Sequence, residues 1–283
     1  MKQIPIISSF GALAERYDAL LCDAWGVIHD GVTLFPGVAD ALTRFHENCG
    51  PVIILTNAPR PSSVIPPQLA RLGLPKAAVD GIVTSGDATR AAIVARLPAP
   101  AFRLGPSKDD ALFQGLDIDF RPVEEAEFVI CTGMIDDQND QPEDYRELLS
   151  KAAQRRLPMI CANPDIVVNW GGRMIWCAGA LAEIYAEFGG EVIFGGKPHA
   201  PIYDLALEKV DELRGQKTAK NRILAVGDGL KTDILGANKQ DIDVLLIAGD
   251  GGIHDGATDS ASIAAQLDVA GVTAVAAAEA LTW

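Results

Sequence analysis

The sequence is short of cations. Its 24 lysine and arginine residues stand against 38 aspartate and glutamate residues, which gives the 283-residue chain a net charge of −14. Binding to nucleic acid or to an anionic membrane needs clustered cations that neutralise phosphates, so we expect neither partner. Any phosphate site must then be local, built from a few cations, backbone amides or a metal ion.

Long hydrophobic runs are also missing. The N-terminal stretch MKQIPIISSFGALAERYD contains no continuous apolar segment of signal-peptide length. No other segment approaches the roughly 20 apolar residues that a membrane-spanning helix requires. These absences predict a soluble cytoplasmic protein.

Closely spaced cysteines are absent as well. The five cysteines are odd in number and scattered along the chain, at positions 22, 49, 131, 161 and 177. Structural zinc sites and disulfide frameworks use paired or regularly spaced cysteines. We therefore expect small buried hydrophobic residues, with no zinc site and no disulfide.

Short apolar runs alternate with segments of helical periodicity. The runs are Ala19–Cys22, Val52–Leu55, Ile82–Val83, Phe128–Cys131, Met159–Cys161, Met174–Trp176, Val192–Phe194, Ile223–Val226 and Val244–Ile247. The helices expected between them are Gly37–Glu47, Asp87–Arg96, Glu143–Arg155, Ala178–Phe188, Pro201–Leu213 and Thr232–Asn238. Continuously apolar strands that alternate with helices predict an α/β fold whose parallel sheet is covered on both faces.

Polar groups follow four of these runs directly. They are Asp23, the pair Thr56 and Asn57, Lys197 after two glycines, and Asp228 after one glycine. In open parallel sheets the carboxyl ends of the strands line the ligand crevice, so we expect these groups to form one site. The segment from about 80 to 185 adds no comparable group and has its own strand–helix series, which predicts an inserted second domain.

The residue types at these strand ends suit phosphoryl transfer. Asp23 and Asp228 could hold Mg²⁺, with Asp233 one helical turn further on as a ligand or an acceptor for metal-bound water. Thr56 and Asn57, at an expected helix start, could bind phosphoryl oxygens. Lys197 could neutralise phosphate and keep Asp23 ionised.

The ordered set of motifs resembles the haloacid dehalogenase superfamily, in particular its NagD-like, p-nitrophenyl-phosphatase-like branch (subclass IIA). The motifs are LLCDAWGVIHDG, VIILTNAPRP, ANPD, GGKPH and GDGLKTDI. The resemblance implies a Rossmann-like core from residues 1–79 and 186–283, with an α/β cap inserted at 80–185. It also implies a small phosphorylated metabolite as substrate and, by analogy alone, a possible homodimer.

The resemblance implies a role for each residue of the expected site. Asp23 would be the nucleophile that forms an aspartyl-phosphate, Thr56 and Asn57 would bind the phosphoryl group, and Lys197 would stabilise its charge. The Mg²⁺ ligands would be Asp23, Asp228, Asp233 and the backbone carbonyl of Trp25.

Trp25 departs from the family pattern, because phosphatases of this family carry a second aspartate there as general acid and base. Three alternatives follow. The chain is a Mg²⁺-dependent phosphatase that has relocated or dispensed with this group, with His29 as the nearest titratable side chain. It is a metal-independent carbon–halogen hydrolase, since the family's dehalogenases carry an aromatic residue here. Or it is a non-catalytic protein that binds a phosphorylated ligand or a partner.

Further polar residues could face the site from the cap or the C-terminal region. They are Arg121, Asp136, Asp137, the loop 169–173 and His254. None of them has a spacing that predicts a role, and the sequence assigns them none.

Overall fold

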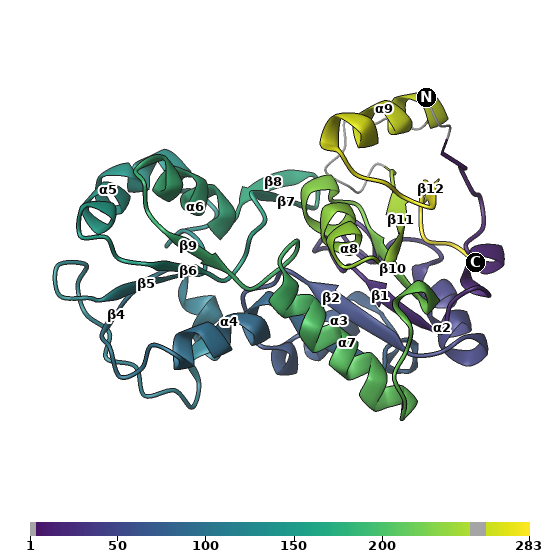
Figure 1. The fold of residues 1–283 in the computed structure, drawn as a ribbon, viewed down its shortest axis with the longest axis horizontal. Coiled ribbons are helices and arrows are strands. Elements are labelled where there is room, and N and C mark those ends of the chain that lie inside the picture. The colour runs from purple at the N-terminus through teal and green to yellow at the C-terminus, as the bar shows by residue number, and fades with distance from the viewer. Residues whose placement is uncertain (1–3, 250–258) are drawn as a thin grey trace.

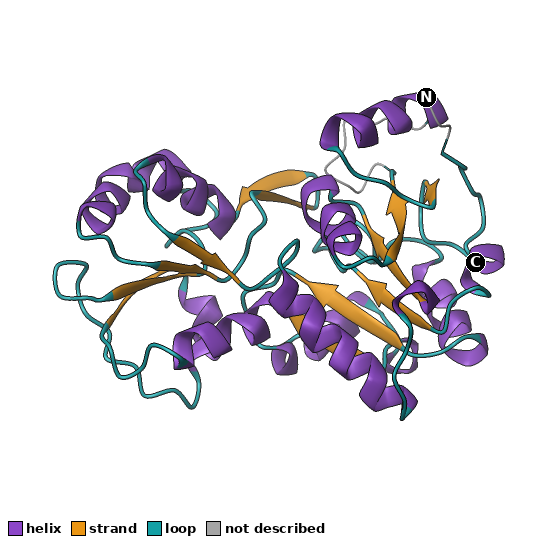
Figure 2. Ribbon diagram, in the orientation of Figure 1, coloured by secondary structure: helices purple, strands orange, loops and turns teal. Residues whose placement is uncertain are grey.

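The computed structural model describes residues 4–249 and 259–283. Within these ranges no helix combines the length and the apolar composition that crossing a membrane requires. The strands form two separate parallel sheets and one hairpin (Figures 1 and 2). The predicted α/β class with a parallel sheet is confirmed.

The larger sheet has six parallel strands in the order β12-β11-β10-β1-β2-β3. In chain order their bounds are β1 Ala19–Cys22, β2 Val52–Thr56, β3 Gly81–Thr84, β10 Ile223–Gly227, β11 Asp243–Ile247 and β12 Ala276–Ala278. Every residue of β1, β2 and β10 is buried. This burial on both faces explains why these strands are continuously apolar.

Helices cover both faces of the larger sheet. On one face α2 (Val38–Asn48) packs through Leu42 and Phe45, together with α1 (Gly11–Ala14) and α3 (Pro66–Leu72). The other face is covered by α7 (Ala200–Arg214), α8 (Leu235–Lys239) and α9 (Ser260–Ala270). The result is a three-layer unit with a hydrophobic core on each side of its sheet.

The smaller sheet has four parallel strands in the order β4-β5-β6-β9. Its strands are β4 Ala101–Leu104, β5 Phe128–Cys131, β6 Met159–Cys161 and β9 Val192–Phe194. Helices α5 (Arg146–Gln154) and α6 (Ala178–Glu187) cover one face, and α4 (Ser85–Val94) packs on the other. The antiparallel hairpin β7 (Val167–Trp170) and β8 (Arg173–Trp176) lies between the two sheets in Figure 1.

Two strands pair differently from the expected domain boundaries. Strand β3, at the start of the expected cap, pairs with β2 in the larger sheet, and β9, expected in the core, pairs with β6. The assumption that Lys197 follows a strand of the larger sheet is therefore wrong. A three- or four-residue apolar run carries no signal of which sheet it joins.

The expected helices are present with shifted ends. Helix α4 begins at Ser85, two residues before the expected start, because Thr84 caps it and forms a capping box with Asp87. The expected helix 232–238 is a π-helical turn at Leu230–Ile234 that leads into α8. Short 3₁₀ turns cover Ser62–Val64, Lys76–Ala78, Ser107–Phe113, Pro142–Tyr145 and Lys220–Arg222.

Candidate active site

Strand β1 delivers Asp23 to the carboxyl end of the larger sheet. The Asp23 amide still donates to the Val226 carbonyl of β10 at 2.9 Å, so the residue is fixed by the strand ladder. Its Oδ1 accepts the Ala24 amide at 2.7 Å. The carboxylate is buried and lines a small cavity at the end of the sheet.

Asp228 and Asp233 lie beside Asp23, and one carboxylate oxygen from each of the three falls within 4.8 Å of the others. Glycines permit this closeness. A Cβ on Gly26, whose φ is +76°, would overlap the Asp228 carboxylate, and one on Gly227 would overlap Asp233. The π-helical turn returns Asp233 to the sheet end, where its Oδ2 accepts the Gly229 amide at 3.2 Å.

Lys197 pairs with two of these carboxylates, those of Asp23 and Asp233. Its side chain is 2% exposed, and Nζ lies 2.7 Å from Oδ1 of Asp23 and 2.7 Å from Oδ1 of Asp233. Of the four predicted strand-end groups, the structure brings Asp23, Lys197 and Asp228 together, and Asn57 lies against the Lys197 main chain. Asp233 joins them, so three carboxylates and one ammonium share a buried site with an excess of negative charge.

Burial and the neighbouring carboxylates both disfavour ionisation of Asp23. Burial raises the pKa of Asp23 well above its ordinary value, Asp233 and Asp228 raise it further, and Lys197 only partly opposes them. Lys197 thus acts on Asp23 in the direction that the sequence predicted, and burial and the neighbouring carboxylates act against it. A hard cation bound by the three carboxylates would restore the charge balance, and oxygen ligands of this kind fit Mg²⁺.

The Asn57 side chain, which was expected to bind phosphoryl oxygens, forms hydrogen bonds to Lys197 and Asp165. Its Oδ1 accepts the Lys197 amide at 2.8 Å, and its Nδ2 donates to the Lys197 carbonyl at 3.2 Å and to Oδ1 of Asp165 at 2.8 Å. The side chain thus positions the lysine loop. The helix start expected at Thr56-Asn57 is wrong, since the next helical turn begins at Ser62. The Thr56 hydroxyl is buried and accepts the Ala58 amide at 3.3 Å.

Asp165, the last residue of the ANPD motif, is a site residue to which the sequence assigned no role. It lines the small cavity with Asp23, so the prediction that residues 80–185 add no group comparable to the other strand-end groups is wrong. Burial raises the pKa of Asp165, and Lys197 and Asn57 oppose this rise. The signal was available, because the Asn-Pro-Asp segment follows β6 just as Asp23 follows β1.

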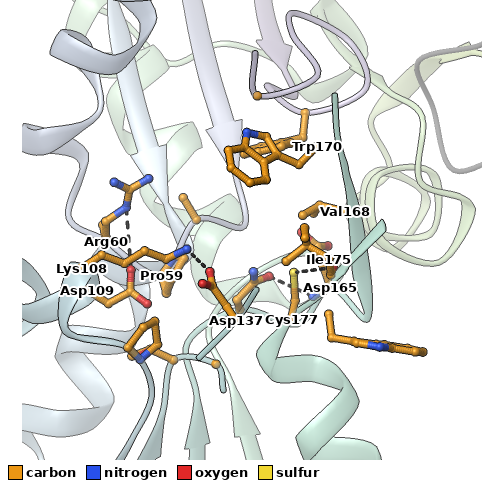
Figure 3. Close-up of a pocket in the computed structure, with 18 of the residues that line it drawn as sticks. Pro59, Arg60, Lys108, Asp109, Asp137, Asp165, Val168, Trp170, Ile175 and Cys177 are labelled. Atoms are coloured by element: carbon orange, nitrogen blue, oxygen red, sulfur yellow. Dashed lines mark hydrogen bonds and ion pairs between the residues drawn. The ribbon is translucent and has the colours of Figure 1, made fainter. Parts of the chain in front are cut away.

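A larger cavity of about 610 Å³ adjoins the small one (Figure 3). Three residues line both: Trp25, Asp165 and Val168. Figure 3 shows Arg60, Lys108 and Asp109 grouped at one side of the larger cavity, with Val168 and Ile175 at the other. The cavity is thus suited to the part of a substrate that extends away from the carboxylate cluster.

The far edge of the Trp25 indole lies beside Gly31. A Cβ on Gly31 would overlap both Trp25 and Trp170, so the two indoles meet at this glycine. The Trp25 ring also contacts the His29 ring edge-on, with 5.0 Å between centroids. Trp25 is therefore part of an aromatic wall at the junction of the two cavities.

His29 does not fit a relocated general acid. Its side chain is buried, its Nδ1 accepts the Gly31 amide at 2.9 Å, and it lines neither of these two cavities. Burial lowers the pKa of His29 to about 4, with Asp30 acting weakly in the opposite direction. The imidazole is neutral at physiological pH and has no proton to donate from Nδ1.

Of the remaining polar candidates, Asp137 and Trp170 line the larger cavity, and Asp137 pairs with Lys108. Arg121 is exposed and pairs with Asp119 and Glu125. Asp136 is exposed and accepts hydrogen bonds from its own turn. His254 lies outside the described residues.

Comparisons of the sequence with protein families give two matches. Residues 20–119 match a family described as haloacid dehalogenase-like hydrolase. Residues 194–272 match one described as HAD-hydrolase-like. A comparison with curated proteins gives no match.

Solved structures resemble the whole chain. A hydrolase of the haloacid dehalogenase-like family from Brucella suis 1330 is 43% identical, with a TM-score of 0.88 over 98% of this chain and 100% of that one. A possible sugar phosphatase from Cytophaga hutchinsonii is 24% identical, with a TM-score of 0.79 over 97% of each chain. A p-nitrophenyl phosphatase from Archaeoglobus fulgidus is 20% identical, with a TM-score of 0.70 over 93% of this chain and 96% of that one. The last two share the fold.

Proposed function

Because the chain belongs to the haloacid dehalogenase-like family of hydrolases, we propose that it is a Mg²⁺-dependent phosphatase of small phosphorylated metabolites. The membership predicted from the motifs is confirmed. The observation that carries the phosphatase proposal is the buried cluster of Asp23, Asp228 and Asp233, two of which pair with Lys197. Three crowded carboxylates have an evident use when a divalent cation and a phosphoryl group share the site.

The metal would be held by Asp23, Asp228, Asp233 and the backbone carbonyl of Trp25. Bound there, Mg²⁺ would supply positive charge to the oxygens of the transferring phosphoryl group. Lys197 adds a second positive charge from the protein itself, since its Nζ already contacts the nucleophile. Asn57 keeps this lysine in place through its two hydrogen bonds to the Lys197 main chain.

Asp23 is the nucleophile in this proposal. Its carboxylate oxygen attacks phosphorus as the bond from phosphorus to the leaving oxygen breaks, which gives an aspartyl-phosphate and an alkoxide or phenolate that takes up a proton from water. Water then attacks the phosphorus of the aspartyl-phosphate and releases inorganic phosphate. Thr56, at the end of the neighbouring strand β2, binds a phosphoryl oxygen through its hydroxyl.

Because Trp25 supplies no general acid, the rate of ester hydrolysis depends on how stable the leaving group is as an anion. Indole offers one N–H donor and no proton of useful acidity, and His29 is buried away from both cavities. The leaving oxygen therefore departs largely as an anion. Aryl phosphates, whose leaving groups are stable anions, are hydrolysed much faster than alkyl phosphates in this proposal.

The test compares 4-nitrophenyl phosphate with an alkyl phosphate, in the wild type and in Trp25→Asp, with Mg²⁺ present. We expect the wild type to strongly prefer the aryl ester. General acid catalysis is worth about 10²- to 10⁴-fold, so Trp25→Asp accelerates the alkyl ester by roughly this factor and the aryl ester much less. Asp23→Asn abolishes turnover of both and serves as the control.

Other outcomes discriminate between the alternatives. Equal wild-type rates on both esters would contradict the loss of the general acid. Tight phosphate binding without turnover of any ester would favour a non-catalytic binding protein. Metal-independent halide release from a 2-haloacid would establish a carbon–halogen hydrolase.

A further inference from the structure

The larger cavity lies where two sheets point their carboxyl ends at each other. Residues that follow β1 and β2 line it from one sheet, including Trp25 and Arg60. Residues that follow β4, β5 and β6 line it from the other, namely Asp109, Thr132 and Asn163. Carboxyl ends of parallel strands commonly carry ligand-binding groups, so the smaller sheet offers its own set of contacts to a substrate.

Two of these residues, Asp109 and Thr132, each bury a side-chain oxygen that lacks a hydrogen-bond partner within the described part of the chain. Asp109 is 1% exposed and Thr132 is 4% exposed. Neither Oδ1 of Asp109 nor Oγ1 of Thr132 has a hydrogen-bond partner of normal geometry within the described ranges. An unsatisfied buried polar group costs free energy, and both of these line the cavity.

The charges around Asp109 indicate what kind of group would pair with it. Nε of Arg60 lies 3.9 Å from Oδ1 of Asp109, too long for a hydrogen bond but close enough to balance the charge. Burial raises the pKa of Asp109, while Lys108, Arg60 and the neighbouring Thr132 hydroxyl lower it. An ammonium group of a substrate would be repelled by Arg60 and Lys108, whereas a neutral hydroxyl group would not.

We propose that Asp109 and Thr132 form a recognition site for a hydroxyl group on the leaving-group part of the substrate. The hydroxyl donates to Oδ1 of Asp109 and accepts from Oγ1 of Thr132, which satisfies both buried atoms. The preferred substrates are then phosphate monoesters whose leaving group carries a hydroxyl at the end remote from phosphorus. This inference rests on the proposed phosphatase activity for the position of the phosphoryl group.

Between the carboxylate cluster and the Asp109–Thr132 site, the walls of the larger cavity fit a substrate whose middle part is flat or apolar. Trp25 and Trp170 lie on one side of the path and Val168 and Ile175 on another. An aromatic ring packs well against such walls, and an aryl ester also suits a site without a general acid. A hydroxylated aryl phosphate combines both requirements.

The experiment uses ligands that differ by one group. The pair is (hydroxymethyl)phenyl phosphate and ethylphenyl phosphate, as 3- and 4-isomers, together with the corresponding benzylphosphonates that cannot be hydrolysed at phosphorus–oxygen. For the esters kcat/KM is measured, and for the phosphonates Kd is measured by calorimetry with Mg²⁺. We expect the wild type to favour the hydroxylated member of one isomer pair by roughly 10- to 100-fold, the value of a hydrogen bond to a charged group.

The variants separate recognition from structure. Thr132→Val removes the hydroxyl with little change of shape, and Asp109→Asn removes the charge. Each variant lowers the preference for the hydroxylated ligand at least about five-fold. The kcat/KM of the ethyl ester and the Kd of the ethyl phosphonate stay nearly unchanged. The control is Asp110→Asn, since this neighbouring carboxylate is 59% exposed and pairs with Arg103. It keeps the wild-type preference.

Two results would overturn the inference: a wild-type preference near one for both isomers, or a preference that neither Thr132→Val nor Asp109→Asn alters. A structural role would weaken both members of a pair equally and leave their ratio intact. If neither ester is hydrolysed but the hydroxylated phosphonate binds more tightly, the recognition site stands and the proposed phosphatase activity fails.

Discussion

Trp25 lies where the two cavities join, and its indole forms part of the wall of the larger one. The indole meets Trp170 over Gly31 and leaves the carboxylate cluster to Asp23, Asp228 and Asp233. An aspartate at position 25 would place another carboxylate beside three that already share one ammonium. The tryptophan therefore leaves position 25 without a carboxyl group and adds an apolar ring to the wall of the larger cavity.

His29 supplies a prediction at the same scale. Its pKa in the folded protein is about 4, lowered by burial, against about 6.5 in the unfolded chain. Because the folded pKa is depressed, the unfolded state binds the proton more readily at low pH. The stabilisation is complete above pH 6.5 and is lost as the pH falls from 6.5 through 4, by about 3 kcal/mol in total.

The measurement compares urea unfolding of the wild type and His29→Asn at pH 7 and pH 4. Asparagine removes the titration but keeps an acceptor for the Gly31 amide. The stability advantage of the wild type over the variant should shrink by about 3 kcal/mol toward pH 4. A difference that stays constant with pH would mean that His29 is not held neutral by burial.

The β7–β8 hairpin connects the two halves of the site at the scale of elements. The Gly171 amide donates to the Asp30 carbonyl at 3.0 Å, and Trp170 packs over Gly31. The hairpin thereby rests on the loop that follows β1. This docking requires glycine at position 31, because a Cβ there would overlap Trp25 and Trp170.

Gly31→Ala tests this docking against a matched control. Gly31 and Gly73 have φ of +88° and +95°, so alanine costs about 1–2 kcal/mol of backbone strain at either position. Only at Gly31 would the new Cβ also meet two tryptophans, since Gly73 has no atom within 4 Å of that position. We expect Gly31→Ala to lose more stability than Gly73→Ala, to shift the tryptophan fluorescence and to raise KM. Equal stability losses with unchanged spectra would contradict the docking.

The same elements show what a sequence can predict. An apolar run followed at once by a polar residue correctly located Asp23 and Asp228, because the strand itself aims the residue at the crevice. It located Lys197 for the wrong reason, since β9 pairs with the smaller sheet. Sheet membership depends on long-range pairing, which a short run does not encode.

The missed features depend on tertiary contacts in the same way. Asn57 appears in sequence as a helix-starting residue, yet its amide bonds to Lys197 and Asp165, which are 140 and 108 positions away. Asp109 and Thr132 follow strands of modest apolar length and become notable only through burial without partners. The carboxylates of the cluster were predictable, whereas the residues that position them and the lining of the larger cavity were not.

At the scale of the molecule, the net charge of −14 works against a phosphorylated substrate. Long-range attraction from the protein surface does not favour an anion, so the binding free energy must come from the site. Within the carboxylate cluster only Lys197 is positive among the residues that contact Asp23 and Asp233. Cation binding is therefore expected to precede or accompany the binding of phosphate.

The last prediction follows from this charge balance and needs no substrate. Mg²⁺ that binds only the folded state stabilises it by about 2.7 kcal/mol at 100 times its Kd, which raises the thermal midpoint of a chain of this size by roughly 5–10 °C. Asp228→Asn should abolish most of this shift. Asp40→Asn, which removes a 58% exposed carboxylate paired with Arg44, should retain it. Sodium chloride at equal ionic strength controls for screening, and a shift that survives in Asp228→Asn would place the cation elsewhere on the molecule.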